Sequence, residues 1–275
     1  MLDVPVRALA FSPAGDLAVA SGSDVHLVAG ERVVKVGLGD EVTCVAFRDA
    51  RTLAVASKER LSIIELGGKP RITRIEHACT WHTMVWSSDG KYIAGGQYEP
   101  FVDIIDVEAR RELRVLDPDE FDDEGRTAVL FVNATLVTTA YNKLVRWRFA
   151  DVIAGKAKCR MPKTGVTGHA HLFEIVPLAD GSLMALVDSE DKSTLQRFAP
   201  TGEKMGKQLP IDRAFRLAVS GDELVLAGET TWLAALDGTT LCTLDETLPD
   251  PQALAVLGDR IAIGGERGLR VVSRQ

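Results

Sequence analysis

The sequence predicts an all-β fold: a single seven-bladed β-propeller, built as a closed ring of four-stranded antiparallel blades. Three observations support this prediction. A unit of about 40 residues recurs seven times along the chain. Each unit contains short apolar runs separated by Gly, Asp, Asn or Ser, a pattern typical of strands joined by tight turns. With 46% apolar and 26% charged residues among 275, the chain has ample material for a core, and the composition excludes disorder.

The repeat is clearest in the first two units. The segment from Val6 reads VRALAFSPAGDLAVASGSDVHLV, and the segment from Val42, 36 residues further on, reads VTCVAFRDARTLAVASKERLSII. Both contain V-x-x-x-A-F, a turn, and then L-A-V-A-S. An anchor residue ends the first apolar run of every unit, and successive anchors are separated by 36, 39, 45, 45, 43 and 37 residues. The anchors are Phe11, Phe47, Trp86, Phe131, Val176, Val219 and Val256.

The second apolar run of each unit predicts a strand buried on both faces. These runs are continuously apolar and rich in Ala and Gly, as in LAVAS at residues 17–21 and YIAGG at residues 92–96. Small side chains would let neighbouring blades approach closely near the ring axis. The chain is therefore expected to form one domain. Its predicted blades cover residues 6–38, 41–76, 80–116, 126–163, 170–210, 213–248 and 251–275.

Turns, one helical turn and the ring closure complete the prediction. Gly and Asp mark the turn between the first two runs, as in Gly15-Asp16 and Asp89-Gly90. A single helical turn is expected at residues 151–155, with Asp151 as N-cap and Gly155 as the stop. The last unit ends after three runs, so residues 1–5 are expected to supply its missing outer strand and close the ring.

Charge and cysteine content limit the classes of function. The net charge of −7 and the pI near 5.3 are unlike the basic footprint of a nucleic-acid binder, so no nucleic acid is expected as a partner. No apolar run is long enough for a membrane span, and the N-terminus does not read as a signal peptide. The four cysteines are widely separated and form no CxxC pair, which suits a reducing cytoplasm.

Several segments resemble the WD-repeat family. Residues 6–24 resemble the first half of such a repeat, and LVRWRF at residues 144–149 is similar to its third strand, with Trp147 in place of the signature Trp. Gly168-His169 stands where the repeat opens with Gly-His. Most units depart from these motifs, and the family's structural tetrad of His, Ser/Thr, Asp and Trp is incomplete in every blade. The resemblance implies a rigid platform that recruits other macromolecules and is rarely catalytic.

Motifs for catalysis are mostly absent from the sequence. It contains no GxSxG elbow and no HExxH zinc motif. Residues 202–208, GEKMGKQ, approach a phosphate-binding loop but lack its final Ser/Thr and its strand-to-helix context, so they are better explained as a turn between outer strands. The sequence therefore predicts no catalytic residue and no cofactor.

Histidines offer a metal site as an alternative to a structural role. His77 and His82 flank Cys79, and His169 and His171 form an H-x-H pair. His77 and His169 occupy the position of the WD family's structural His, which the resemblance implies is hydrogen-bonded within its blade. The structural interpretation is preferred, and no metal ligand is assigned.

An acidic run at residues 117–125 is the sharpest local feature of the sequence. It holds six carboxylates in nine residues, together with Phe121. A solvated loop is one interpretation, and a Ca²⁺ loop is another, although the spacing does not match an EF-hand. The third is a contact for a basic partner surface, with aromatic residues from neighbouring loops. On that interpretation, the residues predicted to contact a partner are Trp81, Tyr98, Glu99, Asp119, Phe121, Asp122 and Asp123.

The leading expectation is a non-enzymatic, cytoplasmic interaction scaffold that presents loops of its top face to a protein or peptide partner. One alternative is a propeller enzyme or small-ligand binder of the lactonase or hydrolase type, with a site in the central channel where His82, His171 and Glu174 converge. Another is a structural subunit that assembles through its outer blade edges.

Overall fold

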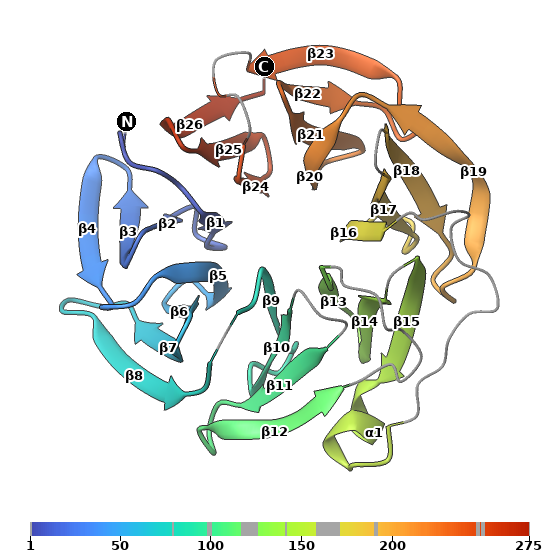
Figure 1. Ribbon diagram of the computed structural model, residues 1–275. Helices are drawn as coiled ribbons and strands as arrows, with labels where there is room; N and C mark the ends of the chain where they lie inside the picture. Colours follow the sequence, from blue (N-terminus) through green and yellow to red (C-terminus); the bar gives the residue numbers. More distant parts are fainter. Residues whose placement is uncertain are drawn as a thin grey trace.

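Seven antiparallel sheets surround a central axis and form a propeller ring (Figure 1). The computed structural model describes residues 2–78, 80–97, 101–116, 126–140, 142–157, 171–189, 192–245, 248 and 251–274. The sheets follow one another around the ring in chain order, and each corresponds to one predicted repeat unit, although β19 ends at Ile211, one residue past its predicted blade. The predicted all-β, seven-bladed fold is confirmed.

The four strands of a blade lie at increasing distance from the axis (Figure 1). The innermost strands are β1 (Ala8–Phe11), β5 (Val42–Asp49), β9 (Thr83–Trp86), β13 (Val129–Val132), β16 (His171–Pro177), β20 (Ala214–Ser220) and β24 (Ala253–Leu257). The second strands are β2 (Leu17–Ser21), β6 (Thr52–Ser57), β10 (Tyr92–Gly96), β14 (Thr135–Ala140), β17 (Leu183–Ser189), β21 (Glu223–Gly228) and β25 (Arg260–Gly265). The third strands are β3 (Asp24–Ala29), β7 (Arg60–Glu65), β11 (Val102–Asp106), β15 (Lys143–Arg148), β18 (Lys192–Phe198), β22 (Thr231–Ala234) and β26 (Gly268–Ser273). The outermost strands are β4 (Arg32–Gly37), β8 (Arg71–Glu76), β12 (Arg111–Leu116), β19 (Lys204–Ile211) and β23 (Thr240–Asp245).

Strand register confirms the alignment of the repeats. Phe11 pairs with Leu17, and Phe47 pairs with Leu53 at the same place in the next blade. The other anchors likewise pair with an apolar residue of the second strand. These pairs are Trp86–Ile93, Phe131–Leu136, Val176–Met184, Val219–Leu224 and Val256–Ile261.

The second strands are buried on both faces, as their continuous apolarity predicts. Ala18, Val19 and Ala20 of β2 have no exposed surface. Hydrophobic clusters span neighbouring blades, and one of them joins residues of blade two, such as Ile63, to Ile93 of blade three. The core is therefore a series of interfaces between blades, each of which depends on both neighbours.

Five sheets have four strands among the described residues, and two have three. In blade four, the last part of the predicted blade, residues 158–163, lies outside the described residues. In the last blade, β26 is the third and final strand.

The N-terminal segment contacts the last blade at the turn between β25 and β26. The N–H of Leu269 donates to the carbonyl of Leu2 at 3.2 Å, and the N–H of Val6 donates to the carbonyl of Gly265 at 2.9 Å. The segment thus closes the ring as predicted, but residues 2–5 do not form the expected fourth strand along β26. Pro5 has no N–H to donate, and the chain must turn inward at Val6 to begin blade one.

The single helix, α1 (Phe149–Ile153), directly follows β15 in blade four. Gly155 stops it as predicted, with φ of +72° and the paired hydrogen bonds Gly155 N–H to Val152 and Lys156 N–H to Asp151. The predicted N-cap is wrong, because the helix begins two residues earlier and Asp151 lies in its first turn. No helix in the described segments is long and apolar enough to cross a membrane.

All innermost strands begin at the same face of the ring. In an antiparallel blade, this is the face at which the second strand turns into the third and the outermost strand crosses to the next blade. We call it the entry face. Gln97 directly follows β10, and Leu116 ends β12, so both lie at the entry face. They flank the segments 98–100 and 117–125.

Candidate functional site

A cavity of about 330 Å³ opens where the innermost strands begin. We call it the channel mouth. It is lined by residues in or just before all seven innermost strands, from Ala8 of β1 to Leu254 of β24. Because every blade contributes, the cavity lies on the axis of the ring at the entry face.

Three innermost strands carry a β-bulge at the channel mouth. Pairing with the second strand shifts between Val42 and Cys44 in β5, between Leu172 and Glu174 in β16, and between Ala214 and Arg216 in β20. A bulge inserts one residue and changes the direction of the side chains beside it. Cys44, Glu174 and Arg216 all line the cavity.

Two arginines and a phenylalanine form the charged wall of the channel mouth. The guanidinium carbon of Arg126 lies 4.6 Å from the ring centroid of Phe173, and that of Arg216 lies 5.9 Å from the same centroid. Arg126 belongs to blade four, Phe173 to blade five and Arg216 to blade six. Stacking on an aromatic face orients a guanidinium group while leaving its edge available for hydrogen bonds.

Arg216 is held in place by several polar contacts. Its Nε donates to the carbonyl of Gln252 at 2.8 Å, and its Nη1 donates to the carbonyl of Phe215 at 2.9 Å. Nη1 also lies 3.4 Å from Oε1 of Glu174, and each of these two side chains is only 19% exposed. The guanidinium group is thus ordered before any ligand arrives.

Glu174 is the carboxylate partner inside the cavity. Its Oε2 accepts the backbone N–H of Leu217 at 2.5 Å. Burial raises the pKa of Glu174, and the nearby Arg216 and Arg126 oppose that increase. The carboxylate therefore links blade five to blade six and offsets part of the positive charge.

His82 and Cys44 line the same cavity in neutral forms. Burial lowers the pKa of His82 to about 3, and the positive charges of Arg126 and Arg216 contribute to that shift. Burial raises the pKa of Cys44 to about 12. At neutral pH a neutral imidazole with so low a pKa is a weak base, and a protonated thiol is a weak nucleophile.

Ion pairs at the rim balance their own charges. Nζ of Lys58 lies 2.5 Å from Oε2 of Glu41, and Nη2 of Arg7 lies 3.8 Å from Oε1 of Glu266. All four side chains are at least 45% exposed, so water and salt screen them.

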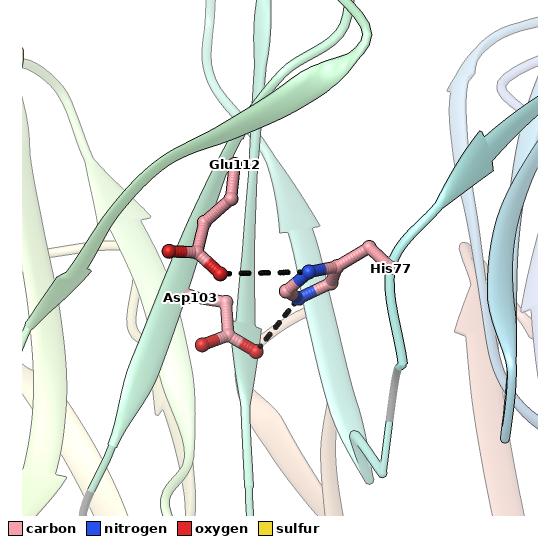
Figure 2. A group of neighbouring side chains, drawn as sticks. All are labelled: His77, Asp103 and Glu112. Atoms are coloured by element: carbon pink, nitrogen blue, oxygen red, sulfur yellow. Dashed lines mark hydrogen bonds and ion pairs between the residues drawn. The ribbon is translucent and has the colours of Figure 1, made fainter.

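A second polar cluster lies in blade three, around the buried carboxylate of Asp103 (Figure 2). Its Oδ2 accepts Nε1–H of Trp81 at 2.6 Å and Nε2–H of Gln97 at 2.7 Å, and lies 3.2 Å from Nε2 of His77. The other ring nitrogen of His77, Nδ1, lies 3.5 Å from Oε2 of Glu112. His77 therefore bridges two carboxylates, on β11 and β12.

Side-chain types alone would make His77, Asp103 and Glu112 a candidate metal group, because ligand atoms of all three lie within 4.8 Å of one another. The hydrogen bonds favour a structural role instead. Oδ2 of Asp103 already accepts two donors besides His77, and the two nitrogens of His77 face different carboxylates (Figure 2). A metal would bind one nitrogen and would have to displace these donors. The predicted hydrogen bonding of His77 within the blade is confirmed.

Of the residues predicted to contact a partner, only Trp81 lies among the described residues. Trp81 lies in the core with no exposed surface, so its indole ring is not available to a partner, which corrects the expectation for this residue. Its N–H is satisfied by Asp103, and its ring packs in a space that Gly95 of β10 leaves open. The other predicted contacts lie outside the described residues. They are Tyr98, Glu99, Asp119, Phe121, Asp122 and Asp123.

The expected convergence of channel residues is partly observed. His82 and Glu174 line the same cavity, whereas His171 is not among its lining residues. The two arginines were missed by sequence reasoning. The sequence did contain a signal for them. Arg126 precedes the anchor Phe131 by five residues, and Arg216 precedes the anchor Val219 by three, which places both near the start of an innermost strand.

No protein-family model matches the sequence, and no curated protein matches it.

Proposed function

We propose that this protein is a non-enzymatic interaction module of WD-repeat type, located in the cytoplasm, that presents its entry face to a protein or peptide partner. The observation that carries the proposal is the channel mouth, where Arg216 and Phe173 are ordered by neighbouring blades at the centre of that face. Gln97 and Leu116, which flank the segments 98–100 and 117–125 predicted to contact a partner, lie at the same face. A rigid ring with an ordered, charged centre is suited to recognition.

Two contacts support a WD-type origin of the blades. Nε1–H of Trp147, on the third strand of blade four, donates to Oγ1 of Thr138 on the second strand at 3.0 Å. His77, which precedes blade three, is hydrogen-bonded to Asp103 of that blade. These are parts of the His, Ser/Thr, Asp and Trp tetrad that the family resemblance implies, although they occur in different blades.

The test is affinity purification of the full-length chain from its native cell, with identification of the proteins that co-elute. The Asp122→Lys/Asp123→Lys variant and the Tyr98→Ala variant are expected to lose the same partner. The matched control is Glu31→Lys/Glu108→Lys, which reverses two exposed carboxylates in turns at the opposite face. A partner retained by both loop variants, or lost equally by the control, would contradict the proposal.

A small-ligand or enzymatic site in the channel is the second candidate. It is favoured by the shared position of His82, Glu174 and two arginines in one cavity. Metal analysis of the purified chain tests the metal-dependent form of this candidate. A stoichiometric metal that is lost in Glu174→Gln and kept in Glu31→Lys would favour it over the interaction module.

A further inference from the structure

We propose that the channel mouth is a binding site for a single carboxylate group, with Arg126 and Arg216 as its hydrogen-bond donors. This inference deepens the proposed function, on which it rests, by naming the chemical group that the centre of the entry face recognises.

The geometry provides two guanidinium groups directed at one cavity. Both lie within 6 Å of the ring centroid of Phe173, and both line the cavity. A guanidinium group carries five N–H donors in a planar fork that matches a carboxylate, and it stays protonated at any physiological pH. Arg216 uses Nε and Nη1 for the carbonyls of Gln252 and Phe215, which orients the rest of the fork.

The charge of the inner cavity favours a monoanion. Among the described residues that line the inner cavity, two guanidinium groups lie with one carboxylate, that of Glu174. The rim adds no net charge, because Lys58 pairs with Glu41 and Arg7 with Glu266. One added carboxylate would bring a single negative charge to these arginines, whereas a dianionic phosphate would bring two negative charges into a half-buried space.

The neutral His82 supports a positive potential inside the cavity. Arg126 and Arg216 both contribute to its lowered pKa, after burial as the main cause. This local positive charge stands against a chain with a net charge of −7. It would therefore select for an anion at one point of an otherwise acidic molecule.

The size of the cavity fits a carboxylate on a short stem. A volume of about 330 Å³ lies near the lower end of the range for small-molecule sites, roughly 300 to 1,000 Å³. One acidic side chain of a protein partner, or a small free carboxylic acid, would fit inside it with room for water. Leu9 and Val45, from the innermost strands of blades one and two, line it beside the charged groups and offer apolar contact to the stem.

The test is an NMR titration of the full-length chain with N-acetyl-glutamate amide, using N-acetyl-glutamine amide as the uncharged control. The glutamate probe is expected to bind about tenfold or more tightly than the glutamine probe, because only the carboxylate forms charge-assisted bonds with both arginines. Arg126→Gln and Arg216→Gln should each weaken binding of the glutamate probe about tenfold. Arg71→Gln, on the outer strand β8 with a side chain 78% exposed, should leave it unchanged.

Glu174→Gln separates binding from folding. It removes the competing carboxylate while keeping an oxygen that can accept from Leu217, so binding of the glutamate probe should become tighter, an outcome that misfolding cannot produce. Equal binding of both probes, no effect of the arginine variants, or tighter binding of inorganic phosphate than of the glutamate probe would overturn the inference.

The source of the carboxylate is resolved by a third probe, a capped pentapeptide with glutamate between two glycines on either side. Tighter binding than that of the single amino acid indicates a partner's side chain, and equal binding indicates a free carboxylic acid; both outcomes support the site. If the probes fail while the loop variants still lose a cellular partner, the carboxylate site is rejected and the interaction module stands.

Discussion

One buried carboxylate, Asp103, organises the start of blade three. Oδ2 gathers the indole N–H of Trp81, the amide of Gln97 and the imidazole of His77. Burying a carboxylate costs several kcal/mol unless hydrogen bonds replace its water, and three donors do so here. The network joins the connection that enters the blade to β11, so it fixes where blade three begins at the entry face.

The His77 contact predicts a specific pH dependence of stability. The hydrogen bond to Asp103, with the charges of Asp103 and Glu112, raises the pKa of His77 above its usual 6.5 although burial opposes the shift. The folded state thus favours the imidazolium. Its stabilising effect is fully present below the unfolded pKa and is lost as the pH rises through the raised folded pKa.

The measurement is urea unfolding of wild type and His77→Gln near pH 6 and near pH 9. The loss of unfolding free energy in the variant should be larger near pH 6 by about 1 kcal/mol, the difference between a charged and a neutral hydrogen bond. His26→Gln, on β3 of blade one, is the control. A variant whose loss is the same at both pH values would show that the imidazolium adds nothing.

At the scale of elements, two glycines in the second strand of blade three allow neighbouring segments to pack closely against it. A Cβ on Gly95 would lie 2.0 Å from Cδ2 of Trp81, and one on Gly96 would lie 1.9 Å from the carbonyl oxygen of Thr127. The carbonyl belongs to the backbone entering blade four and cannot move aside as a flexible side chain could. Gly96 thus sets the distance between blades three and four, whereas Gly95 makes room for the Trp81 ring.

Gly96→Ala is therefore expected to lower the free energy of unfolding by about 3 kcal/mol, because overpacking forces the backbone apart. Gly67→Ala is the matched control, since no atom lies within 4 Å of its added Cβ and its backbone is not in the left-handed region. Urea denaturation of both variants checks the contrast. Equal stability of the two would mean that blades three and four separate without cost.

The elements show what a sequence can predict. Anchors such as Phe11 and Phe47, and the runs that pair with them, follow from alternation and turn residues alone, and their registers are as expected. The β-bulges beside Cys44, Glu174 and Arg216 do not follow, because an inserted residue leaves no trace in an apolar pattern. The bulges alter which side chains face the axis. The residues that line the channel mouth could therefore be identified only from the structure.

Trp81 illustrates a second limit. Its neighbours in sequence are polar, which favours an exposed loop, but its indole ring fills the space opposite Gly95 and donates to Asp103, 22 residues away. Long-range partners of this kind are not visible in local patterns. By contrast, the stop at Gly155 depends only on local backbone geometry and was predicted correctly.

At the scale of the whole molecule, contacts between the first and last blades close the ring. A hydrophobic cluster does this, with Val6, Leu9 and Leu17 of blade one packed against Ala262 and Leu269 of blade seven. The two backbone hydrogen bonds of the N-terminal segment lie beside that cluster. The interface therefore combines side-chain packing with strand-end bonding, although the last blade has three strands in the described residues.

Val6→Ala tests this closure. Val6 is 1% exposed, and its side chain occupies the space that a Cβ on Gly264 would need, so its truncation leaves a cavity between the first and last blades. The free energy of unfolding should fall by about 2 kcal/mol. Val33→Ala, at a site 47% exposed on β4, should change it by less than about 0.5 kcal/mol.

Because each cluster is shared by two blades, the loss should appear as a lower urea midpoint within one cooperative transition. A separate early transition would instead mean that blades one and seven open independently, and that the ring is held by its other interfaces alone.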